Sequence, residues 1–175
     1  MSAPPIKTGL IGWPVGHSLS PAMHNAAFKA LGIEGEYDRY PIEPLELTQE
    51  FERLSARTIT GLNVTIPHKS SILAHARITA ASDEVQAIGA CNTLIRREND
   101  TWHAENTDWR GFLLALERHA LPLDQSTRCL ILGTGGAAQA VAYAFSQRNV
   151  ASIDVASRTP QAADQIGYTQ IRALA

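Results

Sequence analysis

One stretch near the C-terminus constrains the fold more than any other. Residues 128–132 are apolar, residues 133–138 read Gly-Thr-Gly-Gly-Ala-Ala, and residues 139–148 have the composition of a helix. A second apolar run follows at residues 152–156. Strand, glycine turn, helix and strand in this order predict a β-α-β unit with two parallel strands, the beginning of a doubly wound sheet. We therefore expect an α/β protein.

The glycine turn predicts a place for phosphate groups. Glycine at position 133 permits a tight turn, and glycine at position 135 lets the backbone approach a pyrophosphate. Free N–H groups at the start of the following helix can then hold the phosphates of a dinucleotide. A tight turn that binds no ligand is the alternative. The candidate residues are Gly133, Thr134, Gly135, Gly136 and Ala137.

The end of the second strand indicates which dinucleotide binds. An acidic residue there binds the ribose hydroxyls of NAD, whereas arginine accommodates the 2′-phosphate of NADP. Asp154 lies inside the predicted strand, and the strand ends at Ser157, Arg158 and Thr159. A guanidinium flanked by hydroxyls suits a phosphate monoester, which favours NADP. A solvated surface arginine is the alternative.

Composition excludes several classes of protein. The 175 residues are 45% hydrophobic and 18% charged, with a net charge of −2, as in ordinary folded domains. There is no basic stripe with interleaved aromatic residues for nucleic acid, no signal-peptide pattern, no metal-ligand cluster, and no apolar run near the roughly 18 residues of a membrane span. Cys91 and Cys129 lie in apolar segments. We expect reduced core thiols of a cytoplasmic protein, with a disulfide as the alternative.

The first 108 residues read as a separate open-sheet domain. The expected strands are residues 7–13, 37–42, 61–66, 93–96 and 101–105, the last two as a hairpin. The expected helices are residues 22–31 with Ser20 as N-cap, 45–54, 69–75, 83–88 and 107–119.

Three parts of the chain follow from this pattern. We expect a substrate-binding catalytic domain over residues 1–108, a connecting helix and linker over 109–126, and a partial Rossmann domain over 127–175. Residues 161–175 are expected to form at most a helix. The strand at 152–156 would then have an exposed edge.

Two polar clusters accompany the first and third strands. Ser18 and Ser20 precede a helix start, where two hydroxyls can donate to a carboxylate; capping alone would explain Ser20. Asn63 and Thr65 alternate onto one face of their strand. Lys69 follows beyond the strand end, where it can donate or accept a proton, or simply be solvated.

Two further clusters lie at later junctions. Asn92 enters the hairpin after small residues, so its amide can bind a substrate hydroxyl or form an Asx turn. Asp108 begins the helix at residues 107–119, where it or Thr107 can cap the helix. Asp108 could equally pair with Lys69 and orient it.

Taken together, these segments resemble shikimate dehydrogenase. The motifs are Gly12-x-Pro14-x-x-His17-Ser-Leu-Ser-Pro21, Gly61-Leu-Asn-Val-Thr-Ile-Pro-His-Lys69, Gly89-Ala-Cys-Asn-Thr93, Asn106-Thr-Asp108 and Gly133-Thr-Gly-Gly-Ala137. They stand in the family's order and span nearly the whole chain. The resemblance implies an NADP-dependent oxidoreductase of aromatic amino-acid biosynthesis that interconverts shikimate and 3-dehydroshikimate by hydride transfer.

The resemblance also implies roles for individual residues. Ser18 and Ser20 would bind the substrate carboxylate, and Lys69 with Asp108 would form the catalytic pair. The ring hydroxyls would be bound by Asn63, Thr65, Asn92 and Asp108. The cofactor would be held by Asp83, by residues 133–137 and by residues 157–159. Serine rather than threonine at position 20 is similar to the shikimate-specific branch of the family.

Two departures from the family pattern remain. Trp109 follows Asp108 where many members have glycine, which we expect to affect local packing only. The chain is also shorter than the family's enzymes, which end in a helix that brings a glutamine and a tyrosine to the substrate. We therefore expect a folded first domain with little turnover. Three hypotheses stay open: a shikimate dehydrogenase, a broader quinate/shikimate dehydrogenase with wider cofactor use, and a non-catalytic shikimate-binding fragment. A homodimer is one assembly we consider.

Overall fold

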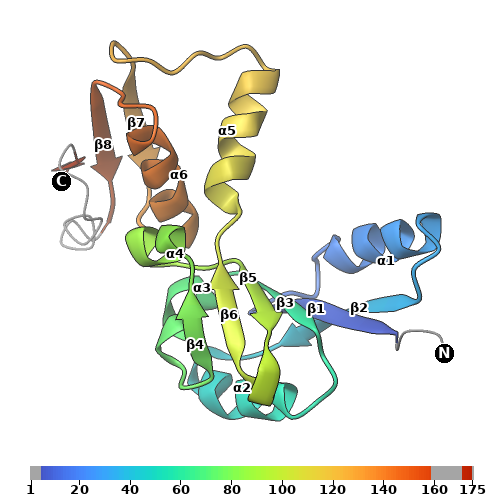
Figure 1. The fold of residues 1–175 in the computed structure, drawn as a ribbon. Coiled ribbons are helices and arrows are strands. Elements are labelled where there is room, and N and C mark those ends of the chain that lie inside the picture. The colour runs from blue at the N-terminus through green and yellow to red at the C-terminus, as the bar shows by residue number, and fades with distance from the viewer. Residues whose placement is uncertain (1–4, 159–170, 175) are drawn as a thin grey trace. The chain divides into compact units, whose positions relative to one another are not determined.

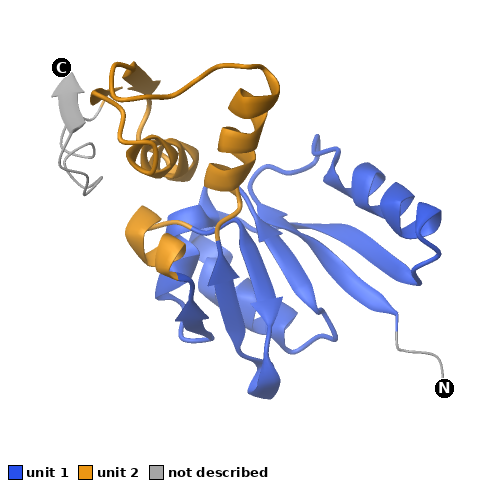
Figure 2. Cartoon of the chain, turned by 45° about the horizontal axis from the view of Figure 1, so that its top comes forward, with its two compact units in different colours: residues 1–82, 91–105 blue, residues 83–90, 106–175 orange. Residues whose placement is uncertain are grey.

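The chain folds into two compact units (Figure 2). The computed structural model describes residues 5–158 and 171–174. Unit 1 comprises Met1–Ser82 and Cys91–Glu105, and unit 2 comprises Asp83–Ala90 and Asn106–Ala175. The segment of residues 83–90 thus belongs with the second unit, although the sequence surrounds it with strands of the first.

Unit 1 is built on a mixed sheet of six strands in the order β2-β1-β3-β5-β6-β4 (Figure 1). The strands are β1 (Ile6–Gly12), β2 (Gly35–Pro41), β3 (Gly61–Val64), β4 (Ile78–Ala81), β5 (Thr93–Arg96) and β6 (Trp102–Glu105). β1 pairs in parallel with β2 and β3, whereas β5 is antiparallel to both β3 and β6. The predicted β5–β6 hairpin is therefore confirmed.

One face of this sheet carries the core of unit 1. It is covered by helix α2 (Leu47–Ser55), which follows the 3-10 turn η1 (Pro44–Glu46), and by the short elements α3 (His68–Ser71) and η2 (Ile72–Ala74). Phe51 of α2 contacts Trp102 of β6 with 5.7 Å between ring centroids, and both side chains are fully buried. The Trp102 indole N–H donates to Ser55 Oγ at 2.9 Å, which satisfies its buried donor.

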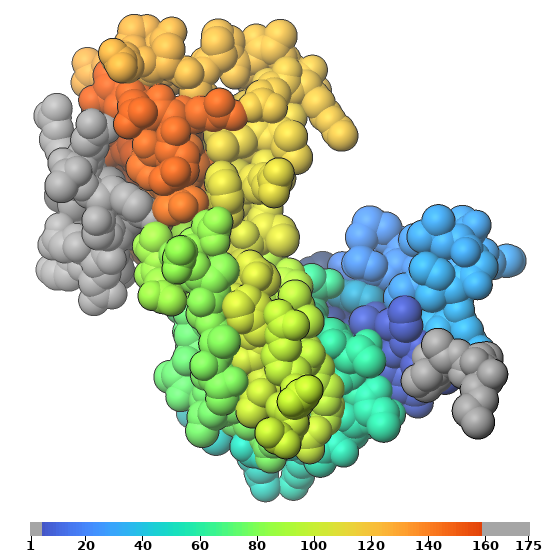
Figure 3. Space-filling view, in the orientation of Figure 1, coloured from blue at the N-terminus to red at the C-terminus, as the bar shows by residue number. Residues whose placement is uncertain are grey.

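Helix α1 (Ser20–Ala30) lies against the opposite face, beside β2. It forms a projecting lobe of unit 1 in the space-filling view, and none of its residues is buried (Figure 3). The prediction that Ser20 caps this helix is wrong. The N-cap is Leu19 without a side-chain cap, and Pro21 lies inside the first turn, so Ser20 is already the first helical residue.

Unit 2 contains the predicted β-α-β unit. β7 (Arg128–Leu132), α6 (Gly136–Ser146) and β8 (Ser152–Ala156) follow one another, and the two strands are parallel. Helices α4 (Asp83–Ile88) and α5 (Asp108–Arg118) belong to the same unit. Its core joins the inward residues of both strands to α6, and Phe112 of α5 meets Phe145 edge-on at 5.4 Å. The α/β class is thus confirmed.

Two expectations for the end of the chain are wrong. Ile171–Leu174 form a strand, β9, rather than part of a helix. β9 pairs in parallel with β8, so β8 is the central strand of the order β7-β8-β9 and has no exposed edge. The reason is tertiary: a short segment takes its conformation from the strand beside it rather than from its own propensity. Within the described residues, no helix is long and apolar enough to cross a membrane.

Candidate active site

The two serines of the first motif are hydrogen-bonded to each other. Ser18 Oγ donates to Ser20 Oγ at 3.1 Å, and the backbone N–H of Ser20 donates to Ser18 Oγ at 3.2 Å. Arg39 of β2 fixes this loop, because its Nε and Nη2 both donate to the Ser18 carbonyl, at 3.2 and 2.5 Å. The pair therefore lies beside a guanidinium, an electrostatic setting that favours a carboxylate.

Tyr37 of β2 extends this pair to the third strand. Its hydroxyl donates to Asn63 Oδ1 at 2.8 Å, and its side chain is only 2% exposed. Burial raises the pKa of Tyr37 to about 12, and a hydrogen bond with Ser20 opposes part of that rise. Tyr37 is thus hydrogen-bonded to Ser20 on one side and donates to Asn63 on the other.

The next links run from Asn63 to Asn92. In the β3–β5 register Asn63 lies opposite Thr93. Asn63 Nδ2 is 3.5 Å from Thr93 Oγ1 and 3.3 Å from the Asn92 carbonyl, and Thr93 Oγ1 donates to Asn92 Oδ1 at 3.0 Å. One hydrogen-bonded polar network thus contains four of the predicted substrate ligands: Ser18, Ser20, Asn63 and Asn92. Tyr37 and Thr93 complete that network.

A cavity of about 190 Å³ adjoins this network on the α1 side of the sheet. Tyr37, Asn63 and Thr93 line it together with apolar side chains that include Phe28 and Ile95. A cavity with an apolar wall and a few fixed polar groups has the character of a small-molecule site.

Thr65 lies directly beyond β3, against the end of β1. Its methyl group is packed on Gly12, where an added Cβ would approach Thr65 Cγ2 to 2.3 Å. Its amide donates to the Ile11 carbonyl at 2.9 Å. Glycine at position 12 is therefore required for this close approach, which places Thr65 at the same sheet edge as the serine loop.

Lys69 lies in α3, the short helix that follows β3. Its carbonyl accepts a 2.8 Å hydrogen bond from the Cys91 amide, which ties the lysine segment to the loop that carries Asn92. The neighbouring His68 turns into the core, with 1% exposure and Nε2 at 2.7 Å from the Ile42 carbonyl. His68 thus anchors α3 while the Lys69 side chain remains half-buried.

Asp108 is the first residue of α5, in unit 2. Asn106 fixes this position from a site with 4% exposure: its Nδ2 donates to the Ala90 carbonyl at 2.8 Å, and its Oδ1 accepts from the Asp108 amide at 3.0 Å. Thr107, one of the two residues considered as caps, is the N-cap of α5 but makes no side-chain cap hydrogen bond. Trp109 packs edge-on against Tyr143 of α6 at 5.2 Å, which accounts for the bulky residue after the aspartate.

The glycine turn of unit 2 has the backbone that its sequence requires. Gly133 has a φ of +108°, a conformation that suits glycine, and its amide donates to the Ala156 carbonyl at 2.8 Å. Gly135 is the N-cap of α6, with ordinary extended dihedrals and nothing within 4 Å of an added Cβ. Among the described residues, no atom lies where a side chain at position 135 would be, and this space fits a ligand that approaches the backbone closely.

The other residues predicted to bind the cofactor are Asp83, Ser157, Arg158 and Thr159. Ser157 is half-buried and Arg158 exposed, directly after β8. Asp154 lies inside β8, opposite Leu130 in the register, as the sequence predicts. Asp83 is exposed at the start of α4. Thr159 lies outside the described residues.

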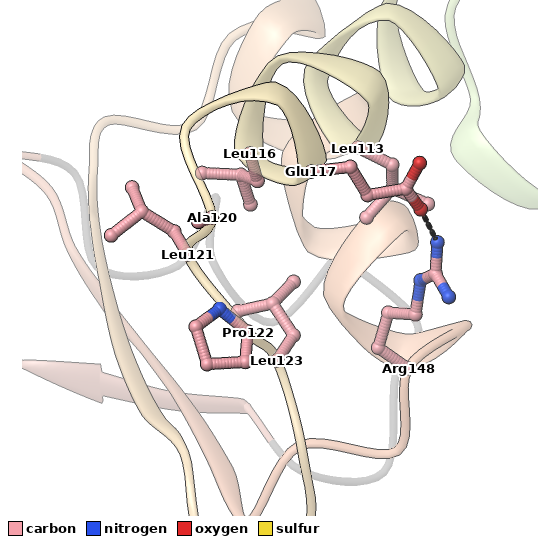
Figure 4. A pocket seen from close by; sticks show the side chains of 8 residues that line it. All are labelled: Leu113, Leu116, Glu117, Ala120, Leu121, Pro122, Leu123 and Arg148. Atoms are coloured by element: carbon pink, nitrogen blue, oxygen red, sulfur yellow. Dashed lines mark hydrogen bonds and ion pairs between the residues drawn. The ribbon is translucent and has the colours of Figure 1, made fainter.

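A larger cavity of unit 2 contains none of these residues. It measures about 430 Å³ and lies between the end of α5, the loop after it and α6 (Figure 4). Its lining is mainly aliphatic, and an ion pair between Arg148 and Glu117 borders it. The other lining residues are Leu113, Leu116, Ala120, Leu121, Pro122 and Leu123. Its chemistry does not suit a polar substrate.

Comparison with known protein families bears on this arrangement. The family model of the shikimate dehydrogenase substrate binding domain matches residues 10–94, which include the serine pair, Asn63 and Lys69. Residues 10–94 are therefore similar to the substrate binding domain of this family. The residues of the polar network lie within this matched range.

Relatives extend the likeness beyond that domain. The shikimate dehydrogenase (NADP(+)) of Dictyoglomus turgidum is 45% identical over 158 residues, which cover 90% of this chain and 56% of the relative. The enzyme of the same name from Methanothermobacter thermautotrophicus is 42% identical, over 89% of this chain and 53% of its own length. The chain thus spans about half the length of these relatives.

Solved structures agree with both comparisons. Shikimate dehydrogenase from Aquifex aeolicus superposes with a TM-score of 0.87 at 34% identity, covering 100% of this chain and 64% of that one. The Thermus thermophilus enzyme, solved in complex with NADP(H) and shikimate, gives 0.82 at 37% identity, covering 97% and 63%.

Sequence reasoning missed three residues of the site. Tyr37, Arg39 and Thr93 stand in ordinary strand sequences, and only the pairing of β2, β1, β3 and β5 brings them to the predicted ligands. Alternation was the available signal, since Tyr37 and Arg39 share the sheet face of Asn63 through the register with β1.

Proposed function

We propose that this protein binds shikimate and NADP and interconverts shikimate with 3-dehydroshikimate. The observation that carries the proposal is the continuous polar network in unit 1, which joins Ser18 and Ser20 to Asn63 and Asn92. A carboxylate needs paired donors at one end of the site, and ring hydroxyls need amides at the other. The relatives' names and the complexed structures support the same substrate and cofactor.

The proposed step is a hydride transfer with a coupled proton transfer. In the oxidation direction, the carbon that bears the 3-hydroxyl loses a hydride and its oxygen loses a proton, leaving the ketone. NADP supplies the hydride acceptor when bound. We assign the proton transfer to Lys69, assisted by Asp108. The serine pair anchors the carboxylate and so orients the reacting carbon.

The cofactor is assigned to unit 2. The open space at Gly135 and the left-handed backbone at Gly133 support a pyrophosphate at the start of α6. Ser157, Arg158 and Thr159 are the proposed ligands of the 2′-phosphate, and Asp83 is proposed to lie near the cofactor. Arginine in place of an acid supports NADP over NAD.

Two measurements test the proposal. Titration calorimetry should detect shikimate binding, and NADPH formation should appear when the protein meets shikimate and NADP⁺. Because the chain spans about half of its relatives, binding without turnover would support a shikimate-binding module instead. Quinate and NAD⁺ in the same assays separate the broader dehydrogenase.

A cytoplasmic location and a homodimer complete the proposal, and light scattering tests the homodimer.

A further inference from the structure

One buried hydroxyl connects the two halves of the proposed site. Tyr37 is hydrogen-bonded to Ser20 and donates to Asn63 Oδ1 at 2.8 Å, so it lies between the serine pair and the amide. Within the part of the chain that the structure describes, it is the link of the polar network that leads from the serine loop to β3. No motif of the sequence includes Tyr37.

The surroundings hold Tyr37 in one position. His24 of α1 stacks on its ring with 4.2 Å between centroids and an interplanar angle of 5°. Asn25 clamps its backbone, accepting from the Tyr37 amide at 2.9 Å and donating to the Tyr37 carbonyl at 3.0 Å. Ser20 and His24 are four residues apart and therefore share the face of α1 that meets β2. Three residues of one helix thus orient a single phenol.

The orientation of the Asn63 amide follows from this phenol. Because the hydroxyl donates, the atom it meets must be Oδ1, and Nδ2 then points toward β5, 3.3 Å from the Asn92 carbonyl and 3.5 Å from Thr93 Oγ1. The hydroxyl of Tyr37 engages Oδ1, whereas the two contacts of Nδ2, at 3.3 and 3.5 Å, are long, so a substrate oxygen can replace one of them as acceptor of an Asn63 N–H. A donor at this position selects a ligand oxygen, such as that of a ring hydroxyl.

We propose that Tyr37 is a positioning residue of the substrate site, which fixes Asn63 as a hydrogen-bond donor to a substrate ring oxygen. This inference rests on the proposed function. Without the hydroxyl, Oδ1 loses its partner and the amide can turn over.

The test is a double-mutant cycle on shikimate affinity, measured by calorimetry on the full chain. Tyr37→Phe keeps the ring and its stack on His24 but removes the hydroxyl. We expect affinity to fall about 10-fold, the usual scale of one lost hydrogen bond. In the Asn63→Ala background, the same change should cost less than about 2-fold. Equal losses in both backgrounds would show that Tyr37 does not act through Asn63.

Tyr40→Phe is the matched control. Tyr40 lies on the same strand with its side chain on the opposite face, beside Arg57. It should leave shikimate affinity unchanged. Equal effects of Tyr37→Phe and Tyr40→Phe would overturn the inference.

A second measurement needs no ligand. The Asn63 side-chain amide can be assigned in an ¹⁵N NMR spectrum because Asn63→Asp deletes its signals. Tyr37→Phe should shift these signals and accelerate their hydrogen exchange by about 10-fold, while Tyr40→Phe should not. Unchanged signals would refute the positioning role. If the wild-type chain binds no shikimate, the proposed function fails, and this measurement still decides the role of Tyr37.

Discussion

The side chain of Asn25 pairs with both backbone groups of Tyr37, as another strand would. Its Oδ1 accepts from the Tyr37 amide at 2.9 Å and its Nδ2 donates to the Tyr37 carbonyl at 3.0 Å. β2 is an edge strand of the sheet, so these groups have no strand partner on that side. A side chain of α1 thus closes part of an otherwise open edge, a recognised way to protect edge strands.

Asn25→Ala should therefore destabilise unit 1 and loosen Tyr37. Two hydrogen bonds worth about 0.5 to 1.5 kcal/mol each are lost, so we expect about 1 to 3 kcal/mol in the free energy of unfolding. Hydrogen exchange at the Tyr37 amide should accelerate accordingly. Met23→Ala, at an exposed position of the same helix, is the control and should change neither quantity. Equal effects of the two substitutions would show that the clamp contributes nothing.

Much of this architecture follows from local sequence signals, and the remainder depends on pairing. The bounds of β8 and the β5–β6 hairpin were predictable because alternation and turn residues lie within a few residues of each other. β4 (Ile78–Ala81) and β9 were missed because their sequences, Ile-Thr-Ala-Ala and Ile-Arg-Ala-Leu, contain alanine, which is depleted in strands. Their strand conformation comes from β6 and β8, their partners in the sheets.

The candidate site shows the same division. Ser18 and Lys69 could be proposed from the sequence because polar side chains at the ends of strands and the starts of helices are typical of binding sites. Tyr37 could not, because its place beside Asn63 depends on two parallel pairings across β1. The error at Ser20 has a similar origin: its hydroxyl is engaged by Ser18 and Tyr37 rather than by the helix terminus.

Ser18→Ala and Ser20→Ala should weaken shikimate binding. Each removes a proposed hydrogen bond to a carboxylate, worth about 1.5 to 3 kcal/mol, or roughly 10- to 100-fold in affinity. Calorimetry with shikimate and with an analogue that lacks the carboxylate separates the anchor from general damage. The analogue should bind both variants as it binds the wild type. Ser71→Ala, at an exposed hydroxyl of α3, serves as the control. Equal weakening of shikimate and the analogue would contradict the anchor.

In a version of the protein extended to the full length of its relatives, Lys69→Ala should affect turnover far more than binding. Loss of a general acid or base lowers kcat by about 10² to 10⁴. Shikimate affinity should change little, since the carboxylate anchor lies on another segment. The matched control is Lys29→Ala on the exposed surface of α1, which should retain full activity. A kcat that survives Lys69→Ala would remove this lysine from the mechanism.

Alkaline pH should erode the stability that Tyr37 contributes. Its pKa is about 12 in the folded protein against 10.0 for the ordinary side chain, so between these values the unfolded chain loses the proton first. Stability from Tyr37 is therefore complete below pH 10 and decreases as pH rises toward 12. At about 1.4 kcal/mol per pKa unit, the stability difference between wild type and Tyr37→Phe should shrink by about 2 to 3 kcal/mol. Urea unfolding of both proteins across this range measures it, and a constant difference would argue against a buried phenol.

Arg158→Ala should weaken NADP binding while NAD binding changes little. Arg158 is exposed directly after β8, at the strand end where dinucleotide enzymes discriminate the two cofactors. Only NADP carries a 2′-phosphate, so only NADP loses a charge-assisted pair, and we expect about 10- to 100-fold in its dissociation constant. Arg128→Ala tests a guanidinium at the start of β7, whereas the glycine turn follows the end of that strand. That control should leave both affinities unchanged. Comparable losses for NADP and NAD in Arg158→Ala would mean that the arginine supports the fold of unit 2 and does not select the cofactor.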